Sequence, residues 1–258
     1  MKNKTAKEIV KSYRIKFALL CVLYALGVGV GIFIITVNPL VGIAAIIALA
    51  ATLRQVFEKL TEKELESVIY DELDPIKLDE MIELGMFKKS IRHKALAALG
   101  RGDYDRVFAL VEESQKKGAN PVEQCNNIYR KGAICFEQHD MEGLRKSVKE
   151  FAALKKQHPK LSAVFHNYTV FEKFDAMVDE DYEYVIEACE VDLAEVNPKV
   201  QNHKMTKLNV SFYRAVALYD MGRLAEAKEA FEEIIAFAPK MHKATISREY
   251  IAKIEQNS

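Results

Sequence analysis

The most prominent pattern in the chain is an apolar run from Phe17 to Leu53 that contains no Asp, Glu, Lys, Arg or His. A single helix of this length would measure about 55 Å, whereas the hydrocarbon core of a bilayer is roughly 30 Å thick. Within the run, Asn38-Pro39 is a turn signal, because proline disfavours helix at the preceding residue and favours a new helix start. We therefore predict a transmembrane hairpin over residues 17–56, with its turn at Asn38-Pro39.

The second half of this hairpin is short for a full crossing, because Arg54 closes the uncharged stretch soon after Leu40. A re-entrant second segment is the alternative. Small residues favour two packed antiparallel spans: Gly27 and Gly31 form one ridge, and a second small-residue face follows in the other span. That second face consists of Ala44, Ala48 and Thr52. The competing reading is that glycine and alanine are simply common in membrane helices.

Basic residues flank the hairpin on both sides and are absent from its turn. The flanking residues are Lys2, Lys4, Lys7, Lys11, Arg14 and Lys16 before the first span, and Arg54, Lys59 and Lys63 after the second. Because cytoplasmic flanks carry the excess of Lys and Arg, we expect a multi-pass protein of the cell (inner) membrane with both termini cytoplasmic. A cleaved secretory signal peptide is the other interpretation, but its apolar region is normally only about 7–15 residues long.

Residues 1–16 are then a basic cytoplasmic tail, and helical spacing of apolar residues continues through a juxtamembrane stalk at residues 57–73. Asp74-Pro75 supplies a stop and a new helix start, so a soluble domain is predicted over residues 74–258. Valine and isoleucine recur there at helical spacing, and turn residues separate the stretches. We therefore predict an all-α fold.

The clearest unit in the soluble domain runs from Arg214 through Asp220-Met221-Gly222 to Pro239, with Ala227 and Phe231 at inward positions. This unit resembles a tetratricopeptide (TPR) repeat, a pair of antiparallel helices joined at a glycine turn. Weaker copies have turns at Gly102-Asp103, His139-Asp140 and Glu180-Asp181. The resemblance implies a TPR-like α-solenoid in which each pair packs on its neighbour, with a C-terminal capping helix over residues 240–256.

The third unit departs from this pattern, because Lys173 stands where the other units have a small residue at the helix crossing: Ala95, Gly132 or Ala215. The packing of this unit is therefore expected to depart from that of the other units. The combination of an apolar hairpin and a helical array is also similar to bacterial membrane-anchored repeat proteins of uncharacterised function, and that likeness implies no activity.

Composition and motif content exclude several classes of function. The chain has 258 residues with 37 basic and 37 acidic side chains, so it lacks the basic character of a nucleic-acid binder. Four cysteines and six histidines show no metal-ligand spacing. No nucleophile elbow, phosphate loop or dinucleotide fingerprint is present. We expect no catalytic activity, no cofactor and no nucleic-acid partner, and the oligomeric state is not readable.

Asparagine recurs at one repeat position near the start of the first helix of three units. In tetratricopeptide solenoids this helix lines the concave groove, so we predict that the groove binds a protein or peptide. Amides would bond the peptide backbone and nearby aromatic rings would form apolar pockets, although helix capping by asparagine explains the recurrence equally well. In the first unit the equivalent residues are Lys89 and Arg92, which would either bind a carboxylate or be solvated charges. The full candidate set is Asn126, Tyr129, Phe136, Asn167, Asn209, Phe212, Tyr219, Lys89 and Arg92.

Acidic residues are concentrated between Glu172 and Glu195, where the net charge is −9. A docking face for a basic partner is one interpretation, and a solvated face balanced by Arg145, Lys146 and Lys149 is the other. Taken together, the patterns indicate a membrane-anchored, cytoplasm-facing adaptor or scaffold. The alternative is an accessory subunit of a membrane enzyme or transport complex, contacted through the hairpin.

Overall fold

The computed structural model describes residues 4–86, 88, 90–200 and 202–256, with the backbone alone described at positions 58, 60–63 and 65. Within this part of the chain all regular structure is helical, in fourteen helices. The chain forms two compact units, a hairpin unit of residues up to 68 together with 77–88, and a helical array of residues 69–76 and 89–258. The all-α prediction is confirmed.

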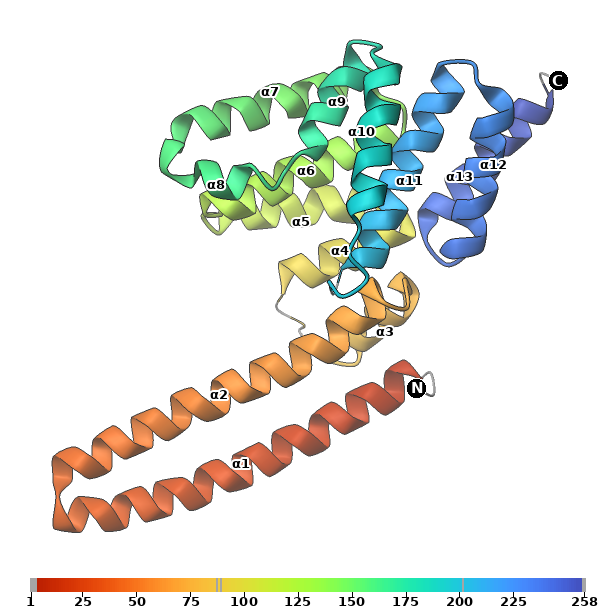
Figure 1. The fold of residues 1–258 in the computed structure, drawn as a ribbon. Helices are drawn as coiled ribbons and strands as arrows, with labels where there is room; N and C mark the ends of the chain where they lie inside the picture. The colour runs from red at the N-terminus through yellow and green to blue at the C-terminus, as the bar shows by residue number, and fades with distance from the viewer. Residues whose placement is uncertain (1–3, 87, 89, 201, 257–258) are drawn as a thin grey trace. The chain divides into compact units, whose positions relative to one another are not determined.

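The hairpin unit consists of two long antiparallel helices, α1 (Ala6–Val37) and α2 (Pro39–Tyr70), joined at Asn38 (Figure 1). Asn38 adopts an extended backbone (φ −146°, ψ 103°), so the predicted turn is confirmed. Thr5 and Glu8 form a capping box that starts α1 well before the apolar run. Helix α2 continues without a break through residues 57–70, so the predicted stalk belongs to the same helix.

Close approach of the two helices occurs at glycines. A Cβ at Gly27 would overlap the Leu49 side chain, and one at Gly31 would overlap Ile46. The partner face on α2 differs from the predicted one, because Ala44, Ala48 and Thr52 are exposed. The glycines leave gaps that large side chains of α2 fill, since a branched side chain makes more dispersion contacts there than alanine would.

The outer surface of the hairpin is apolar and uncovered within the unit. Phe33, Val37 and Leu40 are 71%, 78% and 82% exposed. Residues Ala6–Val37 and Pro39–Phe57 have mean hydropathies of 2.7 and 2.0 in their most apolar windows, and both are long enough to cross a bilayer. A surface of this kind is suited to lipid rather than to water.

The base of the hairpin carries a small core of its own. Ala6, Ile9 and Val10 of α1 are buried, as are Leu78 and Met81 in the part of α3 (Pro75–Glu83) that belongs to this unit. The guanidinium of Arg14 donates to the carbonyl of Leu84 at 2.9 Å, and Lys16 pairs with Glu64. The basic segment before the apolar run is therefore built into the fold.

The array consists of helix pairs that pack in sequence, shown from yellow to blue in Figure 1. The third pair is preceded by a short 3-10 helix and one additional helical turn. The elements are α4 (Ile91–Arg101), α5 (Tyr104–Lys116), α6 (Pro121–Glu137), α7 (Met141–Gln157), η1 (Pro159–Leu161), α8 (Ser162–Phe165), α9 (Val170–Val178), α10 (Tyr182–Glu195), α11 (His203–Asp220), α12 (Leu224–Phe237) and α13 (His242–Gln256).

The turns within the four pairs share one backbone geometry. Gly102, His139, Glu180 and Gly222 all have positive φ, between 57° and 83°. In each turn the next residue donates its backbone N–H to the carbonyl five positions earlier, as in Arg223 to Leu218 at 2.9 Å. The aligned turns of the sequence therefore correspond to one repeated structural unit.

The array also closes on itself, which the linear solenoid expectation did not include. Helix α13 packs on α12 and returns to α4. There His242 lies edge-on to Tyr104 at 5.5 Å between ring centroids, and Lys243 forms an ion pair with Glu137 of α6. The sequence identified a terminal helix, but its second contact surface comes from residues more than a hundred positions away.

Candidate binding cavity

The array contains a half-open cavity of about 420 Å³. Its walls come mainly from α4, α6, α9 and α11, which are the first helices of the four pairs, and from the start of α13. This volume lies within the usual range of ligand sites, about 300–1,000 Å³. We call it the array cavity.

Five of the predicted site residues meet in the array cavity: Arg92, Asn126, Tyr129, Asn167 and Asn209. The amide of Asn126 is already engaged, because its oxygen accepts a hydrogen bond from the Tyr168 hydroxyl at 2.8 Å. Asn167 lies in the turn before α9, and Asn209 lies within α11. The recurrence of asparagine thus coincides with one lining surface.

Helix capping, the competing explanation for these asparagines, is wrong. The residues at the N-cap positions of the three first helices are Asn120, Thr169 and Asn202. Asn120 accepts the N–H of Glu123 at 2.9 Å in this role. A cap residue stands at the helix boundary, whereas Asn126 and Asn209 lie inside their helices and Asn167 precedes the cap residue Thr169.

The remaining predicted site residues lie elsewhere. Phe136 and Phe212 are completely buried in an aromatic core, with ring centroids 6.1 Å apart, so neither offers a surface to a ligand. Tyr219 is half-buried and packs edge-on against Tyr250 at 4.8 Å. Lys89 lies outside the described residues. Phe136 packs on Phe174 of α9 and Tyr213 of α11, and Phe212 packs on Phe231 of α12, so these aromatic positions build the core between neighbouring helices.

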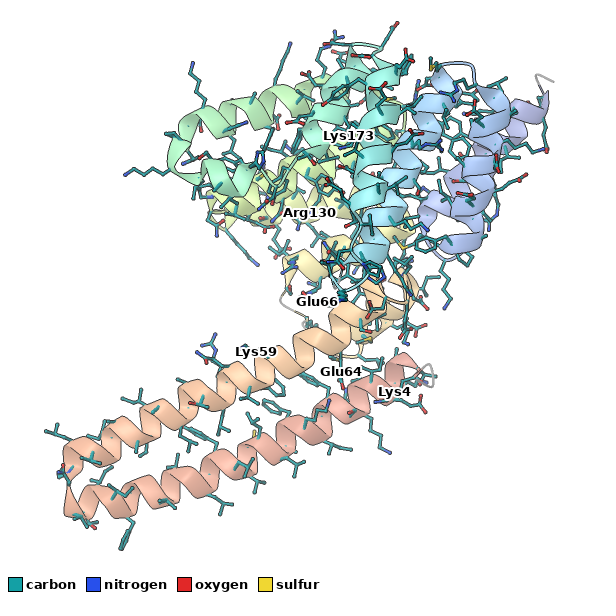
Figure 2. All side chains as sticks on the ribbon, viewed as in Figure 1. Lys4, Lys59, Glu64, Glu66, Arg130 and Lys173 are labelled. Atoms are coloured by element: carbon teal, nitrogen blue, oxygen red, sulfur yellow. The ribbon has the colours of Figure 1, made fainter. Side chains whose placement is uncertain are left out.

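Three cations on the cavity lining are more than nine-tenths buried: Arg130, Lys173 and Lys243. Each has a carboxylate partner. Arg130 bonds Glu123 at 2.8 Å, Lys173 bonds Asp192 at 2.8 Å, and Lys243 pairs with Glu137. Figure 2 labels Arg130, which belongs to α6, and Lys173, which belongs to α9. Pairing of this kind offsets the cost of placing charge in a poorly solvated site.

Lys173 accounts for the departure of the third unit from the repeat pattern. Its long side chain occupies the helix crossing in place of a small residue and ends on Asp192 of the following helix. The first helix of this pair, α9, is also the shortest of the four. The third helix pair therefore forms like the other three, but an ion pair stands at its crossing, where the other pairs have a small residue.

Burial keeps the hydroxyl and thiol groups around the cavity neutral. It raises the pKa of Tyr168 to about 12 and that of Tyr213 well above its ordinary value. It likewise raises the pKa of the Cys125 thiol, which adjoins Tyr168, to about 11. These groups are therefore protonated at neutral pH, so the Tyr168 hydroxyl can donate its proton to the Asn126 oxygen.

Arg130, Lys173, Lys243 and Asp192 were not selected from the sequence as site residues. A lysine at a crossing position was the visible signal for Lys173, because a charge at an apolar repeat position needs a partner. Lys243 carried no such signal. Its position depends on the return of α13 to the first pairs, which no local pattern encodes.

The balancing of acidic residues 172–195 by the basic residues of α7 is not achieved through ion pairs. In the described part of the chain, Asp192 pairs with Lys173 and Glu190 with Arg214 at 3.0 Å. Arg145 instead donates to the carbonyl of Val178 at 3.3 Å. Lys146 and Lys149 of α7 are exposed and have no ion pair with the described acidic segment.

No protein-family model, curated protein or solved structure matches the chain. Among the described residues, no three His, Cys, Asp or Glu side chains are grouped as they would be around a metal ion.

Proposed function

We propose that this protein is an adaptor, anchored in the cell (inner) membrane by its hairpin, which binds a protein or peptide segment in the array cavity. The observation that carries the proposal is the convergence of Arg92, Asn126, Tyr129, Asn167 and Asn209 on one cavity. We further propose that the helix pairs are tetratricopeptide-like repeats, that both termini are cytoplasmic, and that the protein performs no catalysis.

The polar groups of the cavity suit an extended peptide. Asn167 and Asn209 each offer an amide donor and acceptor, and together they match the alternating groups of a backbone. Tyr129 and Val170 add apolar surface beside them. Since Asn126 is held by Tyr168, its role is to position that tyrosine on the wall.

The charges of the lining favour a ligand segment that carries carboxylates. Arg92, Arg130, Lys173 and Lys243 face the cavity, against Asp192 as the acidic side chain of the lining. Glu123 and Glu137, the partners of Arg130 and Lys243, are not among the lining residues. An incoming carboxylate would therefore meet an excess of hydrogen-bond donors.

The test uses the full chain in neutral-lipid nanodiscs and a displayed library of random peptides. Peptides selected on the wild-type protein are assayed against the Asn167→Ala/Asn209→Ala variant, with Gln138→Ala, an exposed position outside the cavity lining, as the control. We expect the double variant to weaken binding at least tenfold and the control to leave it unchanged. Equal affinity for all three proteins would exclude the array cavity as the binding site.

A further inference from the structure

Helix α7 and the adjoining η1 carry an exposed basic surface that the array cavity does not use. Between residues 141 and 161 there are six basic and two acidic side chains, a net charge of +4. All six cations are exposed. We call this surface the α7 basic face, and it consists of Arg145, Lys146, Lys149, Lys155, Lys156 and Lys160.

The helical register places the strongest part of this face opposite the core. Leu144, Ser147, Phe151 and Leu154 form the buried side of α7. Arg145, Lys149 and Lys156 fall within about 40° of one another on the outer side, because successive residues turn by roughly 100°. Figure 2 shows long side chains extending from this helix away from the array.

These six cations have no carboxylate partner in the described part of the chain. None of the six forms an ion pair with any described residue. By contrast, Lys117 bonds Glu113 at 2.6 Å, and Lys228 bonds Glu255 at 2.7 Å. Unpaired like charges in a cluster repel one another, so contact with an anionic surface would stabilise the α7 basic face.

The array is also polarised by its own sequence. The net charge of −9 between residues 172 and 195 lies on the following pair, α9 and α10, so charges of opposite sign occupy neighbouring pairs. In the field of an anionic surface, such a distribution favours one orientation of the array, with α7 toward that surface.

We propose that the α7 basic face docks on the anionic headgroups of the bilayer that holds the hairpin. The proposal rests on the membrane anchoring stated under Proposed function. An anionic bilayer fits better than an acidic protein because the six cations are spread from residue 145 to residue 160, with exposed Ala152 and Ala153 between them, and so extend well beyond the open hollow that Arg145, Lys146 and Lys149 line. A tethered array also meets the lipid surface at high effective concentration, and mobile headgroups adapt to distributed charges.

The experiment measures how fast an amine-reactive reagent modifies individual lysines of the full chain in nanodiscs. Discs of phosphatidylcholine alone are compared with discs that contain roughly one third phosphatidylglycerol, with each modified site quantified by mass spectrometry. We expect Lys146, Lys149 and Lys156 to react several-fold more slowly in the anionic discs. The exposed Lys199 and Lys253 are the internal references and keep their rates.

Salt and charge reversal identify the cause of this protection. At about 0.5 M salt the protection should disappear, since the screening length becomes shorter than the headgroup region. Arg145→Glu/Lys149→Glu/Lys156→Glu should abolish the protection of Lys146, whereas Lys199→Glu/Lys253→Glu should retain it. Both the wild type and the triple variant should keep the same helical circular-dichroism spectrum, because all substituted positions are exposed.

The outcomes separate docking from the other proposals. Equal rates in neutral and anionic discs would overturn docking and leave peptide binding in the array cavity untouched. Protection by added polyglutamate without any effect of anionic lipid would assign the face to acidic polypeptides and overturn the lipid proposal. Failure of the chain to enter neutral discs would overturn anchoring and docking together.

Discussion

Single residues in the turns show how strongly the repeat geometry constrains this chain. Gly222 and Glu180 stand at the same left-handed position of two successive pairs, with φ of 83° and 61°. Glycine adopts this conformation freely, whereas a residue with a Cβ is strained by roughly 1–2 kcal/mol. Glu180 is retained there because the closing hydrogen bond, Asp181 N–H to Ala176 carbonyl at 2.8 Å, needs that backbone.

We expect Glu180→Gly to stabilise the array. Relief of the left-handed strain exceeds the additional chain entropy of glycine in the unfolded state, which leaves a net gain of about 0.5–1 kcal/mol. Chemical denaturation of the detergent-solubilised protein measures the change. Gly222→Ala is the reciprocal control and should lose about 1 kcal/mol, so a stabilising Gly222→Ala would contradict this explanation of the turns.

Asp220 makes stability depend on pH. Burial raises the pKa of its carboxyl from 3.8 to about 6, partly opposed by His139, whose ring nitrogen lies 3.8 Å away. The folded protein therefore holds this proton more tightly than the unfolded chain, and the contribution of Asp220 to stability falls as pH rises from about 4 to 6.

Asp220→Asn should consequently raise the free energy of unfolding at pH 7 by about 1–2 kcal/mol, a value reduced for partial solvent screening. At pH 4 the difference from wild type should be small, because the carboxyl is then largely protonated in the folded state. Denaturant unfolding at both pH values checks this, and His139→Gln serves as the background that removes the neighbouring titration. A gain that is the same at both pH values would show that burial of charge is not its cause.

At the scale of elements, the hairpin could be predicted from the sequence, but the contact face between α1 and α2, here called the seam, could not. The uncharged run and Asn38-Pro39 determine two apolar helices, because length and turn chemistry are local properties. Which face of α2 meets the glycines of α1 depends on the rotation of two helices about their axes. Leu49 and Ile46 occupy that position, where the small residues were expected.

The seam makes a prediction with a matched control. Gly31→Ile should destabilise the hairpin by at least 1–3 kcal/mol, because its side chain would collide with Ile46. Gly29→Ile should be tolerated, since a Cβ at Gly29 meets nothing within 4 Å. Thermal unfolding in detergent, followed by circular dichroism, measures both variants. Equal melting temperatures for the two would mean that α1 and α2 do not pack through this face.

At the scale of the whole molecule, a buried ion pair closes the array. Lys243 of α13 and Glu137 of α6 are both more than nine-tenths buried, and Tyr104 donates to the same carboxylate at 2.8 Å. Removal of one partner leaves an uncompensated buried charge, whereas replacement of both by apolar residues can be nearly neutral.

Lys243→Met should therefore cost about 3–5 kcal/mol, and Lys243→Met combined with Glu137→Leu should recover much of that loss. Denaturant unfolding of the single and double variants measures the coupling between the two sites. If the loss of unfolding free energy in the double variant equals the sum of the losses in the two single variants, the ion pair does not couple α13 to α6.

The proposed topology makes a prediction for the intact cell. A cysteine placed at Asn38 in a background without Cys21 should react with a membrane-impermeant maleimide added from outside, because the turn would face the outer side. A cysteine at Lys253 should react only after the cells are permeabilised. Labelling of both sites in intact cells would contradict cytoplasmic termini.

The sequence by itself determined the helical class, the apolar hairpin and the register of the turns, because periodicity, charge exclusion and turn chemistry act over a few residues. It also brought five cavity residues into one candidate set, since equivalent repeat positions face the same side. Tertiary structure alone decided the rest: the seam of the hairpin, the burial of Phe136 and Phe212, and the closure by Lys243. These depend on contacts between residues far apart in the chain, whose geometry is set by packing and by the pairing of buried charges.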